Sequence, residues 1–260
     1  MASILPYLLA GLFGAAVGSF LNVCIHRLPR HESVVWPASH CPSCASPIAV
    51  SDNIPILSYL LLKGRCRTCR ALISPQYPIV ELANAVGYGL ILWQFGFGWS
   101  SACYALLFSA LLVVSVIDLS HQIIPDRITL PGIVLGLLCA TMILPVGLLD
   151  SVLGALLGGG LLWVLAWASP YLFGREGMGG GDIKLLAMIG AFLGWKPVLL
   201  TIMVGALVGS VVGIGLIAFK VMRRDQYLPF GPFLALGAVV SLFFYRELST
   251  WYLGLITGLR

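Results

Sequence analysis

The sequence predicts an all-α protein that crosses a membrane about eight times, and three observations support this fold class. Of its 260 residues, 59% are hydrophobic and only 10% are charged, whereas soluble domains are about one quarter charged. The apolar residues form continuous runs that approach the ~20 residues a helix needs to cross the hydrocarbon core. They do not alternate with polar residues, as they would in the strands of a membrane β-barrel.

The apolar runs also predict where the spans lie. We expect spans near residues 4–25, 79–97, 101–118, 128–146, 151–173, 183–199, 200–221 and 229–258, with the sixth and seventh divided at Lys196 and Pro197. The first run has no basic residue before it and no small-residue cleavage site after it. We therefore interpret it as a retained span rather than a signal peptide.

The distribution of charge predicts the orientation of the spans. With the N-terminus outside, every Lys and Arg falls on the cytoplasmic side except Lys196, Arg246 and Arg260. Basic residues are enriched in this way in the cytoplasmic loops of helical membrane proteins. The net charge of +5 is spread over short loops and forms no long basic face. Membrane lipid is therefore an expected partner, and nucleic acid is not.

The one long polar segment, residues 26–78, is expected to fold as a small cytoplasmic module between the first two spans. Its four cysteines form two C-x-x-C pairs, Cys41 with Cys44 and Cys66 with Cys69. Two such pairs can supply four thiolates to a tetrahedral zinc ion, as in a zinc ribbon. Structural disulfides are an alternative that a reducing compartment disfavours, and a redox C-x-x-C is another.

Two carboxylates stand at the ends of apolar runs. Asp118 ends the third run, and Asp182 begins the sixth, directly after Gly177-Met-Gly-Gly-Gly181. On the predicted topology both lie at the cytoplasmic ends of their helices, at one depth. Ionisable residues within spans are costly and usually mark function. Two carboxylates that share a proton can activate water and protonate a leaving amine, which is the chemistry of an aspartic protease.

Each acidic candidate has an alternative interpretation. Asp182 could be the N-cap of its helix. Asp126 competes with Asp118, but it follows Pro125 at a position typical of an N-cap and is nearer to solvent. Glu81 is either a helix-start charge favoured by the dipole or a group that binds a cation. Asp52 is interpreted as a loop charge.

Together these motifs resemble the bacterial type 4 prepilin peptidase family of bifunctional leader peptidases and N-methyltransferases. The resemblance covers nearly the whole chain, through Gly18-Ser-Phe-Leu-Asn22, Arg27-Leu-Pro29, Asp52-Asn-Ile-Pro55, Gly64-Arg-Cys66, Tyr77-Pro-Ile-Val-Glu81, Ile117-Asp118, Ile124-Pro-Asp126, Glu176-Gly-Met-Gly-Gly-Gly-Asp182-Ile-Lys184 and Pro229-Phe-Gly-Pro232. It implies cleavage of the leader of type IV prepilins and type II secretion pseudopilins at the cytoplasmic face of the bacterial inner membrane. It also implies methylation of the new N-terminal residue with S-adenosylmethionine.

The resemblance assigns roles to individual residues. Asp118 and Asp182 would be the catalytic pair, with Gly179, Gly181 and Lys184 in the active-site loop. The residues associated with methylation would be Asn22, Arg27, Gly64 and Glu81, and the structural zinc ligands Cys41, Cys44, Cys66 and Cys69. The sequence departs from the family where a glycine commonly follows each C-x-x-C pair, because Ala45 and Arg70 stand there.

The expected domains are a first helix at 1–25, a four-cysteine module associated with methylation at 26–78, and a transmembrane aspartic peptidase domain at 79–260. Two other functions remain as alternatives. The chain could be a peptidase without methyltransferase activity, since it has no glycine-rich nucleotide loop in a βαβ setting. A proton-coupled transporter could also use paired aspartates, but the inverted repeats typical of such proteins are not visible in the sequence.

Overall fold

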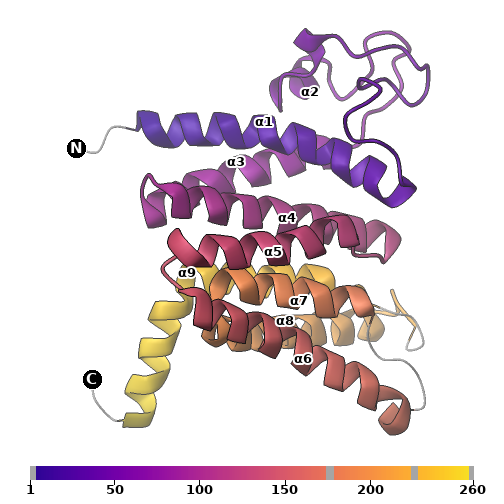
Figure 1. Ribbon diagram of the computed structural model, residues 1–260. Coiled ribbons are helices and arrows are strands. Elements are labelled where there is room, and N and C mark those ends of the chain that lie inside the picture. The colour runs from indigo at the N-terminus through magenta and orange to yellow at the C-terminus, as the bar shows by residue number, and fades with distance from the viewer. Residues whose placement is uncertain (1–3, 174–178, 224–227, 258–260) are drawn as a thin grey trace. The chain divides into compact units, whose positions relative to one another are not determined.

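The computed structural model of the chain describes residues 4–173, 179–223 and 228–257. Within these ranges it is helical and contains no β-strand, which confirms the predicted class. Its long helices are α1 (Leu5–Arg27), α3 (Gln76–Phe95), α4 (Trp99–His121), α5 (Asp126–Met142), α6 (Leu148–Phe173), α7 (Gly180–Leu193), α8 (Trp195–Ala218) and α9 (Gly231–Thr257) (Figure 1). The short helices η1 (Leu28–Arg30), η2 (Val50–Asp52) and α2 (Leu57–Leu61) lie between α1 and α3.

Five of the described helices are long and apolar enough to cross a membrane, within Leu5–Arg30, Trp99–His121, Leu148–Tyr171, Trp195–Ala218 and Gly231–Trp251. Large apolar side chains such as Leu12, Trp163 and Leu207 are more than half exposed on three of them. Exposed apolar surface of this extent is typical of a protein surrounded by lipid. The protein is therefore a helical multi-pass membrane protein, and the total of eight spans stays a prediction.

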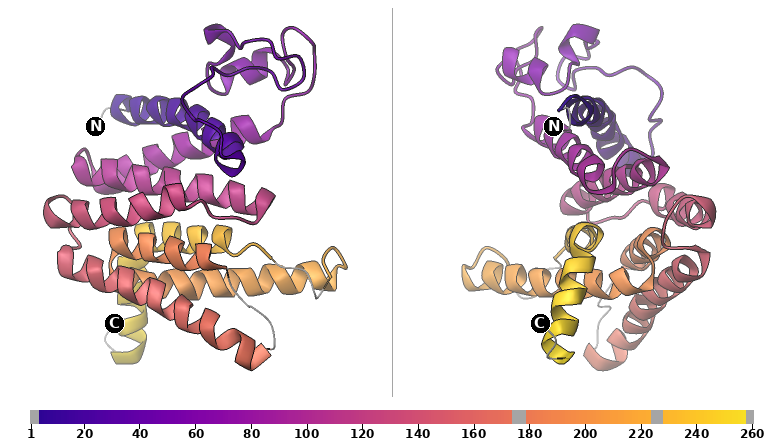
Figure 2. Two further views of the ribbon diagram at one scale, coloured as in Figure 1. Left: turned by 45° about the vertical axis from the view of Figure 1, so that its right-hand side comes forward. Right: turned by 90° about the vertical axis from the view of Figure 1, so that its left-hand side faces the viewer.

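The chain divides into two compact units, Met1–Val113 and Val114–Arg260, with the boundary inside α4. The first unit contains α1, α3 and the cysteine module, whose path is formed mostly by loops (Figures 1 and 2). The second unit contains the last turns of α4 and the helices from α5 to α9.

In the first unit, α1 and α3 pack as an antiparallel pair. A Cβ on Gly18 would lie 2.7 Å from Cα of Glu81, and one on Gly14 would lie 2.9 Å from the carbonyl oxygen of Asn84. Small residues at helical spacing allow helices in lipid to approach this closely. Asn84 joins the pair further, because its Nδ2 donates to the Gly14 carbonyl at 2.8 Å while its Oδ1 accepts from Ser109 of α4 at 3.0 Å.

In the second unit, α7 is the buried helix. Its buried apolar side chains are Leu185, Leu186, Met188, Ile189, Ala191, Phe192 and Leu193. Helices α5 and α6 contact it through glycines: a Cβ on Gly136 would lie 2.8 Å from the Phe192 ring, and one on Gly158 would lie 2.8 Å from the Leu186 carbonyl. These buried apolar residues begin at Leu185, and Asp182 lies before them in the first turn of α7.

The predicted division between the sixth and seventh spans is wrong by a few residues. Helix α7 ends at Leu193 and α8 begins at Trp195, so Lys196 and Pro197 lie in the first turn of α8. Gly194 separates the two helices with a φ of +85°, a conformation that glycine adopts without steric cost. Pro197 is accommodated because the N–H groups of a first turn have no partner within the helix.

Candidate active site and metal centre

Asp118 lies in the last turn of α4, within the second unit. It is only 5% exposed. Its Oδ2 accepts a hydrogen bond from the backbone N–H of Gly231, the first residue of α9, at 2.9 Å. A hydrogen bond to a charged carboxylate is short and directional, so this contact orients the Asp118 side chain.

Asp182 is the third residue of α7 and is 9% exposed. The N-cap of α7 is Gly179, and no side chain caps this helix, so the N-cap interpretation of Asp182 is wrong. The Asp182 carboxylate instead lies close enough to Asp118 for their charges to interact. The second unit thus brings together two buried carboxylates from helices that are distant in sequence.

Two glycines beside this pair leave no room for a side chain. A Cβ on Gly231 would lie 2.7 Å from Oδ2 of Asp118, and one on Gly181 would lie 2.8 Å from Cβ of Ile124. A Cβ on Gly231 would also lie 3.3 Å from Cδ1 of Ile124. Ile124 therefore packs against both glycine segments. Glu176, which begins the motif that carries the family resemblance around Asp182, lies outside the described residues.

Asp126, the competitor of Asp118, has a different partner. It is the first residue of α5, after the N-cap Pro125, and its side chain is 54% exposed. Lys184 contacts both of its carboxylate oxygens, at 2.7 and 2.8 Å. Lys184 of the expected active-site loop therefore neutralises Asp126 from the first turns of α7.

The four cysteines of the module come together in the first unit. The sulfur atoms of Cys41, Cys44, Cys66 and Cys69 all lie within 4.8 Å of one another. Backbone N–H groups of Cys69 and Thr68 donate to the Cys66 sulfur and lower the pKa of this thiol to about 6. Four clustered thiols, one of them ionised at neutral pH, form a donor set that fits a closed tetrahedral metal site.

The cysteine module contains two knuckles, residues 39–48 and 64–73, each built around one C-x-x-C pair. They share one backbone hydrogen-bond pattern at a constant offset of 25 residues. The N–H of Cys41 donates to Ser46 and that of Cys66 to Ala71, both at 2.9 Å. Ala45 and Arg70 adopt φ values of +56° and +61°. Each therefore adopts the left-handed conformation that favours glycine, at a cost of about 1–2 kcal/mol.

Two of the four residues that the resemblance predicts to serve methylation shape the loops of the first unit. The buried Arg27 donates to the carbonyls of Ser33 and Pro37, at 2.9 and 2.7 Å. Gly64 has a φ of +66°, and a Cβ there would lie 3.0 Å from the Tyr59 ring. Both residues therefore have clear conformational roles.

The other two, Asn22 and Glu81, lie on facing sides of α1 and α3. Asn22 donates from Nδ2 to the Tyr77 carbonyl at 3.1 Å, and its buried Oδ1 has no hydrogen-bond partner among the described residues. Glu81 is 7% exposed and accepts the N–H of Ile56 at 2.7 Å. It is not a helix-start charge, because α3 begins at Gln76 and has no acidic residue in its first turn.

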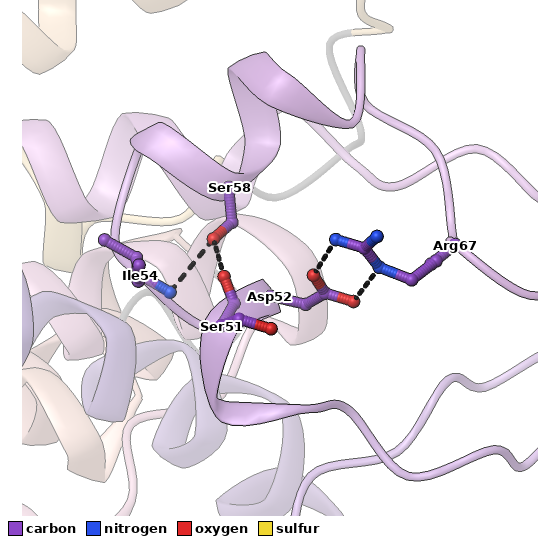
Figure 3. Close-up of polar contacts among 5 residues, drawn as sticks. All are labelled: Ser51, Asp52, Ile54, Ser58 and Arg67. Carbon is purple, nitrogen blue, oxygen red and sulfur yellow. Dashed lines mark hydrogen bonds and ion pairs between the residues drawn. The ribbon is translucent and has the colours of Figure 1, made fainter.

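Asp52, which the sequence analysis interprets as a loop charge, is the last residue of the short helix η2 and has an ion-pair partner. Its side chain is 9% exposed and lies against Arg67, which donates from Nε and Nη2 to the two carboxylate oxygens (Figure 3). The Arg67 guanidinium holds the pKa of Asp52 below its usual range. No sequence signal identifies this pair, because the two residues meet only when the module folds.

Comparison with known proteins identifies the family of this chain. Residues 12–95 match the bacterial peptidase A24 N-terminal domain, and residues 105–214 match the type IV leader peptidase family. The chain is 40% identical to the prepilin leader peptidase/N-methyltransferase of Aeromonas salmonicida strain A449, over 97% of this chain and 96% of that protein. This chain belongs to the type IV leader peptidase family.

Two further proteins similar to this chain are also named prepilin leader peptidase/N-methyltransferase. The Pseudomonas aeruginosa protein is 38% identical over 93% of this chain and 91% of its own length, and the Stutzerimonas stutzeri protein is 39% identical over 95% and 93%. No solved structure matches the chain. The family resemblance of the sequence is thus confirmed. Sequence reasoning missed the contact of Gly231 with Asp118, although the Pro229-Phe-Gly-Pro232 motif marks its place.

Proposed function

We propose that this enzyme cleaves the leader peptide of type IV prepilins and type II secretion pseudopilins, and then methylates the new N-terminal residue. The proximity of the buried Asp118 and Asp182 carboxylates is the observation that carries the peptidase half. The full-length similarity to proteins named prepilin leader peptidase/N-methyltransferase supports both halves.

In the proposed peptidase reaction, the two carboxylates share one proton, because two buried carboxylates whose charges interact cannot both ionise easily. One carboxylate takes a proton from the attacking water, and the other donates its proton to the leaving amine. Gly231 orients Asp118 through its N–H. A Cβ on Gly179 would meet no atom closer than Oδ2 of Asp182, at 3.8 Å, so a peptide backbone can approach this position beside Asp182.

In the methyltransferase half we propose roles for Asn22, Arg27, Gly64 and Glu81. S-adenosylmethionine supplies an electrophilic methyl group when bound. The buried Glu81 carboxylate and the unpartnered Oδ1 of Asn22 are acceptors that fit a cationic ligand, either this methyl donor or the substrate ammonium. Arg27 and Gly64 shape the loops beside them.

Cys41, Cys44, Cys66 and Cys69 would hold a structural zinc ion. The clustering of their sulfur atoms within 4.8 Å supports this assignment. Zinc would cross-link the two knuckles of a module that is small for a core of its own. We place the module and both catalytic aspartates on the cytoplasmic side of the bacterial inner membrane, because the basic loops follow that orientation.

The test is co-expression of a prepilin with the wild-type enzyme or with Asp118→Ala or Asp182→Ala. We expect each substitution to abolish cleavage while the protein still inserts into the membrane. Asp126→Ala is the matched control, since this exposed carboxylate is paired with Lys184, and it should retain cleavage. Normal processing by either dyad variant would refute the assignment.

A further inference from the structure

The ion pair between Asp52 and Arg67 is more than a surface contact. The guanidinium makes two hydrogen bonds to the carboxylate, at 2.7 and 2.5 Å (Figure 3). The Asp52 side chain is 9% exposed, whereas that of Arg67 is 66% exposed. Exposed ion pairs contribute little to stability, but the two hydrogen bonds of a bidentate guanidinium fix the position of the carboxylate that accepts them.

This pair connects the second cysteine knuckle to a turn of the chain far from it in sequence. Arg67 lies between Cys66 and Cys69, so the knuckle determines where its guanidinium can reach. On the other side, Ser58 closes the turn at residues 51–58: its hydroxyl accepts from the N–H of Ile54 at 3.0 Å and donates to the Ser51 carbonyl at 2.9 Å (Figure 3). Residues 51–58 therefore form one braced unit.

The same turn ends at a buried carboxylate of α3. Ile56 has a φ of +62°, which is a costly conformation for a β-branched residue. In this conformation its N–H donates to Oε2 of Glu81 at 2.7 Å. The segment closed by Asp52 and Arg67 also contains Gly64. The contacts thus run from the cysteine knuckle through Arg67, Asp52 and Ile56 to Glu81.

We infer that Asp52 and Arg67 are positioning residues for methyl transfer: they fix residues 51–58, and with them the Ile56 N–H, against Glu81. This inference rests on the proposed function, which assigns Glu81 to the methyltransferase half. We call the Asp52–Arg67 ion pair, together with the turn at residues 51–58, the brace. Because Arg67 lies in the second cysteine knuckle, the brace also links Glu81 to the cluster of four cysteines. The brace belongs to the first unit and the two catalytic aspartates to the second, so the peptidase reaction is not expected to depend on it.

The experiment uses the full-length enzyme in membranes, co-expressed with a prepilin, as wild type, Asp52→Asn, Arg67→Gln and the double variant. Arg65→Gln is the control, because it removes a positive charge from the same knuckle. Four quantities are measured: cleavage, the N-methylated fraction of cleaved pilin by mass spectrometry, zinc content, and amide hydrogen exchange of residues 51–58.

We expect each single variant to lower methylation by about tenfold or more while zinc content and cleavage are retained, because the lost bidentate pair frees the turn. Exchange in residues 51–58 should accelerate. The double variant should lose no more than either single one, since the two side chains act through each other. Arg65→Gln should behave like wild type.

Unchanged methylation in both single variants, additive losses in the double variant, or an equal loss in Arg65→Gln would overturn the inference. A loss of zinc in step with methylation would also overturn it, because the effect would then arise from metal loading. If the wild-type enzyme cleaves but does not methylate, the proposed methyltransferase function fails instead. The exchange measurement then still decides whether the brace exists: unchanged exchange in the single variants refutes it.

Discussion

The backbone N–H of Gly231 donates to Oδ2 of Asp118 at 2.9 Å, across 113 positions of sequence. The bond joins the first residue of α9 to the last turn of α4. A Cβ at position 231 would approach the same oxygen to 2.7 Å, closer than real Cβ contacts come. The glycine is therefore explained by the close approach of backbone to carboxylate.

Gly231→Ala should displace the Asp118 carboxylate. We expect the rate of prepilin cleavage to fall by about 100-fold, because a misplacement of about 1 Å in a catalytic group can cost that much. Initial rates in membranes containing equal amounts of enzyme measure the effect. Gly215→Ala is the control, since a Cβ there meets nothing within 4 Å. Equal rates for both variants would show that the contact does not position Asp118.

The ion pair between Asp126 and Lys184 should matter little for stability. Its side chains are 54% and 39% exposed, and exposed pairs contribute about 0–1 kcal/mol. A double-mutant cycle with Asp126→Asn and Lys184→Met, followed by thermal unfolding in detergent, should give a coupling energy below about 1 kcal/mol. A larger coupling would mean that the pair also holds α5 against α7.

Because Ala45 adopts a left-handed conformation, we expect a glycine at this position to strengthen metal retention. Ala45→Gly should strengthen metal retention by about 1 kcal/mol, because glycine adopts the φ of +56° without the steric cost that alanine carries. The chelator concentration that releases half of the zinc measures this gain. Ser43→Gly, in the same knuckle but without a positive φ, should give no gain. An equal gain in Ser43→Gly would attribute the effect to flexibility alone.

Removal of the proposed zinc ion should expose reactive thiols in a defined order. In metal-free protein, Cys66 has a pKa of about 6, so its thiolate fraction rises as the pH increases through this value and is nearly complete well above it. Alkylation by iodoacetamide at neutral pH should therefore label Cys66 first. Peptide mapping after timed labelling checks the order, with Cys66→Ser as the control. Slow labelling of Cys66 at neutral pH would contradict the lowered pKa.

The fold class could be predicted from the sequence because the length of an apolar run must match the thickness of the hydrocarbon core. The acidic pair and the four cysteines could also be found, since carboxylates at the ends of apolar runs and paired C-x-x-C motifs are rare by chance. The junction of α7 and α8 could not, because residues 183–221 form one apolar stretch with few interruptions, Lys196 and Pro197 among them. The backbone conformation of Gly194 decides the division there.

The contacts that orient the candidate sites were beyond sequence reasoning. In the sequence, nothing distinguishes Asp52 from other loop aspartates, and its ion pair with Arg67 forms only in the folded module. Glu81 accepts the Ile56 N–H where Ile56 adopts a positive φ. Gly231 contributes a backbone N–H, which carries no sequence signature of its own. In each case two segments distant in the chain create the environment, and local patterns do not encode such meetings.

The equivalent knuckles at residues 39–48 and 64–73 have a consequence for how the module could arise. Each supplies two thiols and closes with the same backbone hydrogen bonds, so a single knuckle offers half of a tetrahedral site. Two copies of one short peptide could therefore complete the site as a metal-linked homodimer. Duplication of one such hairpin within a gene would convert that dimer into a single chain, and the intervening residues would be free to acquire the turn that now contacts α3.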